Sequence, residues 1–297
     1  MTSSKAPEHS TAADRAWRAL AFVLARLPMP LLTPLGALLG ALGSLLAPAR
    51  RRIAARNLEL CFPESNEATR ARMLRAHFAA TGTALLESAL AWAGDRRTIA
   101  GRLDVIGESE LRAALDAQEG VLLLGSHQVT LEIAGACLGT IADVDVVQRE
   151  GRGTALDRLR NRGRARHFST LVDRDDPRTL LRRLQAGRCV WFAFDQDLRR
   201  GAFVPFFGVP AITVDSAARI ARASGARVLF VDHWRTPGRP RWTLRFRTLD
   251  PSTGDPAADT RRFVAAIESA VRAHPEQYLW THRRFKTTPP GESDRYA

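Results

Sequence analysis

The sequence predicts an α/β protein with a mixed, largely parallel central sheet flanked by helices. Three observations lead to this prediction. Short apolar runs typical of strands alternate with longer stretches of helical periodicity, a hydrophobic fraction of 45% over 297 residues suffices for one large core, and no internal repeat is visible. We expect residues 53–297 to form the folded domain. A polar, disordered leader at 1–16 and hydrophobic helices at 17–52 are expected to precede it.

Predicted strands and helices alternate along most of the chain. VLLLG, which directly precedes Ser126, is short and apolar like a buried strand, and ADVDVVQ before Arg149 has the same character. Further strands are expected at 189–194, 226–234 and 242–249. Helical spacing predicts helices at 66–93, 108–118, 128–139, 153–166, 176–186, 213–224 and 258–273.

The hydrophobic segment near the amino end predicts membrane association. Its charge-free part, 31–47, is shorter than the ~20 residues that a straight span needs. The arginines at 50–52 and 56 suit an anionic cytoplasmic leaflet, and a secretory signal is disfavoured because these arginines would have to cross the membrane. A single span, a re-entrant hairpin, an interfacial helix and a hydrophobic hairpin packed on the domain remain alternatives.

The charge of the chain predicts an acidic partner. The formal net charge is +13, and Lys5 and Lys286 are the only lysines, so nearly all basic residues are arginines. Between residues 149 and 188 there are twelve arginines and five acids. Phosphates, an anionic membrane face and an acidic carrier protein all fit this charge, as does simple codon bias.

The three cysteines indicate neither a disulfide framework nor a zinc site. Cys61, Cys137 and Cys189 are odd in number, far apart and set in apolar neighbourhoods. A reducing, cytosol-facing catalytic body is therefore expected, and no metal is predicted.

The stretch GVLLLGSHQVTLEIAG, residues 120–135, places His127 and Glu132 directly after a buried strand. Ligands of open α/β sheets collect beyond the carboxyl ends of the strands, so His127 lies at a predicted site. A spacing of five in one continuous helix would separate the side chains by ~140°. If His127 lies in the turn instead, its ring can reach Glu132, whose carboxylate would orient a general base. A capping histidine beside a solvated glutamate is the alternative interpretation.

Other strings carry a resemblance to a known family. His-x4-Glu after an apolar strand resembles the His-x4-Asp/Glu signature of membrane glycerolipid and lipid A acyltransferases. Similarity continues at LVDRDD (171–176), WFAFDQD (191–197), FVPFFGVPA (203–211) and PEQYLWTHRRFKTTPPGE (275–292). In order and spacing, these strings resemble the late acyltransferases of lipid A synthesis, the lauroyl and myristoyl transferases of Gram-negative bacteria. The resemblance runs from roughly residue 50 to the end, and the hydrophobic segment before it is similar to that family's membrane anchor.

The resemblance implies a reaction, its partners and a location. A fatty acyl chain would pass from an acyl carrier protein thioester to a hydroxyl on an acyl chain of a phosphorylated, Kdo-bearing disaccharide lipid. No cofactor beyond the acyl carrier protein donor is implied. The enzyme would lie at the inner membrane, beside anionic lipids, with its catalytic domain facing the cytoplasm.

The resemblance also implies site residues. His127 matches the family's base and Glu132 its partner, while Arg164 and Asp195 match two further positions needed for activity. Arg149 falls where the family has an arginine between tyrosine and proline, although its neighbours here are a glutamine and a glutamate. A serine at 126 replaces the family's frequent asparagine. These departures concern acceptor recognition, and they leave the base and its acid untouched.

The chemistry of thioester attack suggests roles for these groups. Backbone N–H groups at the start of helix 128–139, or the Arg164 guanidinium, would stabilise negative charge on the carbonyl oxygen. Arg164 is also a candidate for clamping a substrate phosphate. Asp195 would bind substrate or orient Arg164, and Asp197 could take the same part. The FVPFFGV string would line an acyl groove or form a core hairpin.

Three other functions compete with this interpretation. A nucleic-acid-binding protein would explain the arginine excess, but no groove-reading or RNA-binding motif is present. A membrane-anchored thioesterase or lipase would use similar residues, but the sequence has no G-x-S-x-G elbow. The third alternative keeps the fold and changes the acceptor to a glycerophospholipid or an aminolipid.

Overall fold

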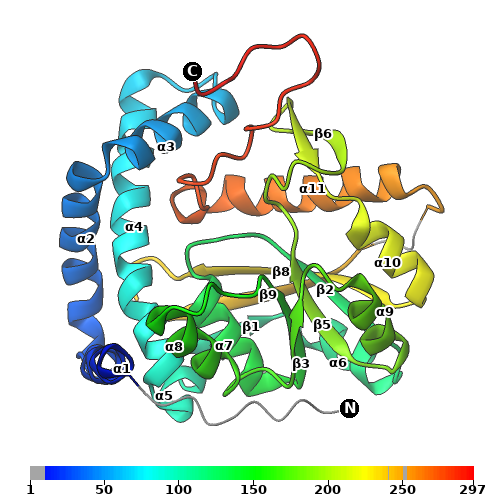
Figure 1. Ribbon diagram of the computed structural model, residues 1–297, viewed down its shortest axis with the longest axis horizontal. Coiled ribbons are helices and arrows are strands. Elements are labelled where there is room, and N and C mark those ends of the chain that lie inside the picture. Colours follow the sequence, from blue (N-terminus) through cyan, green and yellow to red (C-terminus); the bar gives the residue numbers. More distant parts are fainter. Residues whose placement is uncertain (1–10, 240, 250–252) are drawn as a thin grey trace.

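The structure, a computed structural model, describes residues 11–239, 241–249 and 253–297. A seven-stranded sheet lies at its centre, with strand order β1-β9-β8-β2-β5-β3-β4 (Figure 1). Every neighbouring pair is parallel except β8 and β9, so the predicted mixed, largely parallel sheet is confirmed. Its strands are β1 (Leu103–Ile106), β2 (Val121–Gly125), β3 (Val144–Gln148), β4 (Leu171–Asp173), β5 (Cys189–Ala193), β8 (Arg227–Arg235) and β9 (Trp242–Thr248).

Helices cover both faces of the sheet, as the buried central strand β2 requires. Leu122 and Leu124 face one hydrophobic core, and Val121 and Leu123 face the other. All five residues of β2 are buried, as expected for a strand in a parallel sheet. The first core contains residues of α9 (Pro177–Gln185), α10 (Ser216–Ser224) and α11 (Pro256–Ala273), and the second contains residues of α4 (Glu67–Ala93), α6 (Glu108–Asp116) and α7 (Leu131–Ile141).

Most predicted elements are present, with shifted ends. The largest shift that concerns the site is in α7, which begins at Leu131 instead of the predicted residue 128. Helix α8 (Ala155–Arg164) lies inside its predicted range. Strands β1 and β4 and helix α5 (Arg96–Ala100) were not predicted. Unlike β2, which is five residues long and wholly buried, they have no unbroken apolar run that marks a buried strand.

The FVPFFGV string forms the hairpin that was one of its two predicted alternatives. Strands β6 (Ala202–Phe206) and β7 (Val209–Thr213) pair antiparallel. Phe207 and Gly208 between them have φ values of 53° and 76°, the left-handed conformations that a tight two-residue hairpin turn favours. The Phe206 and Phe207 rings are buried in the first core.

The amino-terminal region is helical: α1 (Ala12–Leu24), α2 (Met29–Leu46) and α3 (Pro48–Cys61). Residues 1–10 of the predicted leader lie outside the described residues, and 12–16 belong to α1, so that part of the leader is not disordered. The expected boundary at residue 53 falls inside α3, which buries Ala54 and Leu58 in the core. In the described part of the chain, no single helix is long and apolar enough to cross a membrane. Pro30–Leu46 and Pro48–Cys61 satisfy those criteria only together, and they are bent by 100°.

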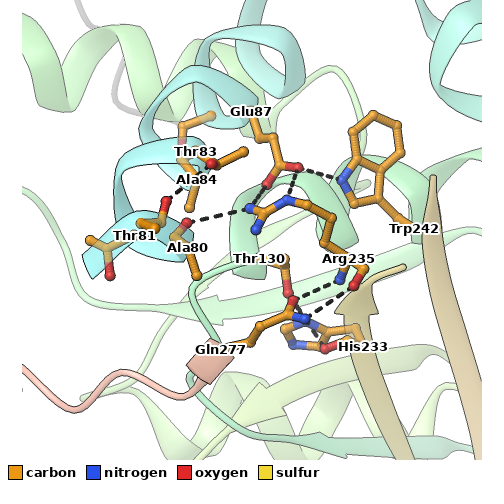
Figure 2. Close-up of polar contacts among 12 residues, drawn as sticks. Ala80, Thr81, Thr83, Ala84, Glu87, Thr130, His233, Arg235, Trp242 and Gln277 are labelled. Carbon is orange, nitrogen blue, oxygen red and sulfur yellow. Dashed lines mark hydrogen bonds and ion pairs between the residues drawn. The ribbon is translucent and has the colours of Figure 1, made fainter. Parts of the chain in front are cut away.

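A buried ion pair fastens α4 to the sheet (Figure 2). The Glu87 carboxylate, on α4, accepts hydrogen bonds from Arg235 Nε and Nη2 at 2.6 and 2.5 Å and from Trp242 Nε1 at 2.8 Å. The Gln277 side chain binds the backbone N–H and carbonyl of Arg235 at 2.7 and 3.0 Å. Helix α4, strands β8 and β9 and the carboxyl-terminal segment are therefore joined through one polar network.

Candidate active site

His127 lies in the loop between β2 and α7, at the carboxyl edge of the sheet. The register of the parallel strands pairs Gly125 of β2 with Ala193 of β5. His127 and Asp195 each follow these partners by two residues, so the sheet brings them together. The predicted position of His127 beyond a core strand is confirmed.

The loop that carries His127 is held by residues 277–279, which we call the carboxyl-terminal strap. Leu279 N–H donates to the His127 carbonyl at 3.0 Å, and Val129 N–H donates to the Gln277 carbonyl at 2.6 Å. The loop residue between them, Gln128, forms an antiparallel bridge with Tyr278. The strap thus fixes the backbone on both sides of the histidine.

The carboxylate that holds the imidazole is Asp195. Its Oδ1 lies 2.6 Å from His127 Nδ1, and both carboxylate oxygens accept the His127 backbone N–H at 3.1 Å. Asp195 is 2% exposed, whereas the His127 side chain is 21% exposed. The acid is therefore enclosed behind a histidine that faces the surface.

Asp195 is ionised in these surroundings. Burial is the largest single influence and would raise the pKa of its carboxyl group. The charge of His127 and the hydrogen bonds from it, together with nearby Arg284, outweigh burial and lower the pKa to about 2. An ionised acceptor requires the proton of a neutral imidazole to reside on Nδ1, which leaves Nε2 able to accept a proton.

Glu132 does not hold His127, so this part of the sequence prediction is wrong. The Glu132 carboxylate accepts hydrogen bonds from Arg164 Nε at 3.2 Å, from Arg164 Nη2 and from Trp92 Nε1 at 2.7 Å. Because α7 begins at Leu131, Glu132 lies in the first helical turn and pairs with α8, while the neighbouring strand supplies the acid for His127. Asp195 consequently orients His127. One prediction had Asp195 orient Arg164 instead, and that prediction is wrong.

Arg164 is itself fixed by two partners. It donates to Gln148 Oε1 at 2.6 Å as well as to Glu132, so three of its five N–H groups are used. The remaining two N–H groups can meet a substrate oxygen. Glu132 therefore serves to position a guanidinium whose plane is held from both sides.

Several backbone N–H groups between His127 and the start of α7 already have hydrogen-bond acceptors. Those of His127, Gln128, Val129 and Leu131 already donate to oxygens of Asp195, Ser126, Gln277 and Gln128, respectively. These four N–H groups are therefore not available to an oxyanion. The first turn of α7 and the Arg164 guanidinium stay as the two predicted donors.

A cavity of about 250 Å³ opens beside His127 and contains four predicted site residues in its wall: His127, Glu132, Arg149 and Arg164. Its volume is slightly below the ~300–1,000 Å³ typical of small-molecule sites. Asp195 lies behind this wall. The apolar part of the wall includes Leu131, Val146, Phe168, Trp191, Phe194 and Val214.

The cavity wall is strongly basic. Glu132 is the single acid among the described lining residues, against five arginines, which are Arg149, Arg160, Arg164, Arg174 and Arg200. Arg149 is exposed and has no hydrogen bond or ion pair with the described residues. The cavity can therefore receive an apolar chain attached to an anionic group.

Asp197, the predicted alternative to Asp195, contacts the carboxyl-terminal segment and not His127. Its carboxylate accepts the Thr287 N–H at 2.7 Å and the Thr287 hydroxyl at 3.0 Å. Its own N–H donates to His282 Nε2 at 3.1 Å, and burial lowers the pKa of His282 to about 4, consistent with a neutral acceptor. Asp197 thus joins the end of β5 to the carboxyl-terminal segment.

Sequence reasoning missed the carboxyl-terminal contribution to the site. Besides the strap, it missed Arg284, which is 1% exposed and donates to the Ile212 carbonyl at 2.7 Å and the Thr213 hydroxyl at 2.6 Å. The family-like string at 275–292 was the available signal, but it could not show which residues contact the histidine loop. Among the described residues, no group of three or more His, Cys, Asp or Glu side chains is arranged to hold a metal ion.

A histidine braced by a buried carboxylate, at the mouth of a partly apolar and strongly basic cavity, is the arrangement of an enzyme that handles acyl substrates bearing anionic groups. The chain belongs to the bacterial lipid A biosynthesis acyltransferase family, whose sequence model matches residues 5–287. The predicted family and enzyme class are confirmed. This membership favours an acyltransferase over the nucleic-acid-binding and lipase alternatives.

Curated relatives match over nearly the whole chain. The lipid A biosynthesis lauroyltransferase of Escherichia coli K12 is 35% identical over 283 residues, which cover 93% of this chain and 92% of the relative. The palmitoleoyltransferase of the same organism is 34% identical over 278 residues, covering 91% and 90%. Its myristoyltransferase is 28% identical over 274 residues, covering 90% and 83%.

Proposed function

We propose that this acyltransferase moves a fatty acyl chain from an acyl carrier protein thioester to a hydroxyl of a lipid A precursor, with His127 as general base. The family and the names of its relatives support lipid A synthesis as the process. One observation carries the catalytic assignment: His127 lines the cavity while its Nδ1 lies 2.6 Å from the buried carboxylate of Asp195.

The reaction proceeds by direct attack of the acceptor alcohol. His127 Nε2 takes the hydroxyl proton as the alcohol oxygen bonds to the thioester carbonyl carbon. Asp195 stabilises the imidazolium formed. Collapse of the tetrahedral intermediate breaks the carbon–sulfur bond, and the imidazolium returns its proton to the departing thiolate. An ester and a free thiol result.

Arg164 is the proposed donor to the developing oxyanion, and Glu132 positions it. A guanidinium held on two sides needs little reorganisation as negative charge develops, which is the condition for effective electrostatic stabilisation. In this assignment Glu132 is essential without touching the base. Arg149, exposed at the cavity wall, is proposed to bind an anionic group of a substrate.

The basic charge of the cavity wall supports the proposed donor protein, and the exposed residues of the amino-terminal helices support the proposed location. The arginines of the cavity wall suit an acidic carrier protein, and no cofactor is required besides its thioester. Exposed leucines of α2 and exposed arginines at 50–52 favour contact with anionic membrane lipids, at the cytoplasmic face of the inner membrane.

Mass spectrometry of lipids tests the proposal. Membranes containing the protein are incubated with acyl carrier protein donors of several chain lengths and the lipid A precursor. We expect an acylated precursor from the wild type and none from His127→Ala, which should still bind membranes. Turnover by His127→Ala at the wild-type rate would refute the assigned base.

The products also separate the alternatives. An acylated glycerophospholipid or aminolipid would move the function to another acceptor of the same fold. Free fatty acid without any acylated lipid would identify a hydrolase.

A further inference from the structure

We propose that the protein is monotopic: α1 and α2 bind the surface of one anionic leaflet, and α2 lies in the membrane interface without crossing the bilayer. The proposal rests on the membrane association of the proposed function and deepens it. The sequence alone had left a span, a re-entrant hairpin, an interfacial helix and a hairpin packed on the domain as alternatives. The choice among these alternatives rests on how α2 is packed in the protein.

Apolar exposure is concentrated on the amino-terminal helices. Of the fourteen exposed large hydrophobic side chains among the described residues, ten belong to α1 and α2. Those of α2, which we call the α2 leucine face, are Leu31, Leu38, Leu39, Leu42, Leu45 and Leu46. Large exposed apolar patches of this kind mark interaction sites on folded proteins.

The opposite side of α2 is in close contact with α4. A Cβ atom at Gly36 would collide with the backbone of Thr83, and one at Gly40 with the carbonyl of Phe78. A Cβ at Gly82 on α4 would in turn collide with the backbone of Gly36. Leu38 and Leu42 each lie two residues from a glycine of this contact, ~200° around the helix, and therefore point away from α4.

Helix α4 cannot follow α2 into a bilayer. The ion pair of Glu87 with Arg235 fastens α4 to β8 (Figure 2), and the helix buries Phe78 and Leu86 in the protein core. Figure 1 shows α4 between α2 and the rest of the protein. A spanning α2 would have to leave α4 and open the glycine contact. An interfacial α2 keeps this contact and covers only its leucine face with lipid.

The start of α3 supplies the charge that an anionic leaflet requires. Arg51 and Arg52 are exposed and have no hydrogen bond or ion pair with the described residues. Positive side chains near the N-terminus of a helix oppose the helix dipole, so helix stability does not explain their placement at the fourth and fifth positions of α3. They lie one to two helical turns beyond the exposed Leu45 and Leu46, across a bend of 100°, which puts a basic rim near the end of the apolar face.

Cysteine accessibility at the two ends of α2 tests the topology. Arg26→Cys precedes α2 and Arg51→Cys follows it, while the native Cys61, Cys137 and Cys189 are buried and give little background. A membrane-impermeant maleimide should label both variants in inverted inner-membrane vesicles and neither in intact spheroplasts. Labelling of Arg26→Cys from the periplasmic side alone would overturn the proposal. This readout does not require catalysis, so it stands whether or not the proposed reaction is correct.

Vesicle binding tests the surface itself. Leu38→Asp and Leu42→Asp should each weaken binding to phosphatidylethanolamine vesicles containing phosphatidylglycerol by about tenfold or more. Ile106→Asp is the matched control, because Ile106 is 49% exposed on β1, away from this face, and should bind as the wild type does. An Arg51→Glu, Arg52→Glu double variant should lose binding to these vesicles but not to phosphatidylcholine alone. If the leucine variants dissociate a dimer and leave vesicle binding unchanged, the face binds a second copy and the proposal is wrong.

Discussion

Two Glu–Arg pairs in this protein are built alike and lie in different surroundings. In both, the glutamate accepts hydrogen bonds from the Nε and Nη2 atoms of an arginine and from a tryptophan Nε1. Glu132 and Arg164 lie in the cavity wall. Glu87 and Arg235 lie within the protein and join α4 to β8. The side-chain exposure of the two glutamates is 17% and 4%.

The same local arrangement can therefore have different roles in the two places. An ion pair sealed in the interior chiefly fixes the arrangement of the elements that it joins, and loss of one partner leaves an uncompensated charge. The same pair beside a substrate cavity keeps a guanidinium ready for a developing negative charge. Substitutions at the Glu132–Arg164 pair should therefore lower kcat, and substitutions at the Glu87–Arg235 pair should lower the free energy of unfolding.

The largest effect is expected at Asp195, which lies close to the Glu132–Arg164 pair of the cavity. Asp195→Asn removes the charge that supports the imidazolium and permits the wrong imidazole tautomer, so kcat should fall by about 10³–10⁴. Steady-state kinetics checks the rate, and circular dichroism checks that the fold is retained. A loss below tenfold in a folded variant would mean that Asp195 does not orient the base.

Glu87→Gln should affect stability most. It leaves Arg235 without its anionic partner, which is expected to lower the free energy of unfolding by about 3–5 kcal/mol. Urea denaturation measures this change. The kcat of the folded fraction should stay close to that of the wild type, and a selective loss of kcat without destabilisation would assign the sealed pair a catalytic role.

Glu132→Gln should show the opposite behaviour. A neutral amide holds Arg164 less firmly, so we expect kcat to fall by about a hundredfold, on the scale of losing one oxyanion donor. The free energy of unfolding should change by only about 1 kcal/mol, because the pair is partly open to the cavity. Glu87→Gln is the matched control in both assays. Equal losses of stability in the two variants would remove the distinction between the pairs.

Acid should lower the free energy of unfolding by protonating buried histidines before it protonates Asp195. Burial lowers the pKa of His77 and His233 from 6.5 to about 4. Because the folded pKa is below the unfolded one, the stabilisation is present above about pH 6.5 and is lost as the pH falls toward 4. The expected slope is about 1.4 kcal/mol per pH unit for each histidine. The contribution of Asp195, whose pKa is about 2, is lost only from about pH 4 downward.

Denaturation at a series of pH values between about 7 and 4 measures this slope. His282, whose pKa is also lowered to about 4, adds to the slope, so His77→Gln and His233→Gln are each expected to reduce it. Stability of the wild type that does not change over this interval would contradict the assignment of buried neutral histidines.

The smallest effect is expected from salt. Carrier-dependent activity should decline several-fold as ionic strength rises, because exposed charges are screened over ~10 Å at 0.1 M and over less at higher salt. The change should appear in KM for the carrier, with kcat nearly constant. A KM that is independent of salt would argue against arginine contacts with the donor.

The sequence predicted the sheet and the location of the site, because strand and helix periodicity and the strand-end position of His127 are local properties. It assigned the wrong acid because the pairing depends on strand order. Sequence spacing brings Glu132 within five residues of His127, but only the adjacency of β2 and β5 brings Asp195 to its ring. Short elements such as β4 were missed because they have no unbroken apolar run that marks a buried strand.

The carboxyl-terminal strap has a consequence for the synthesis of the enzyme. The ribosome makes the histidine loop early and Gln277 and Leu279 more than a hundred residues later. A nascent chain that ends before them already contains every strand of the sheet, yet its histidine loop lacks the two backbone partners that fix it. Unfinished polypeptides are thus expected to be catalytically silent, and the cell gains competent enzyme only when translation reaches the strap.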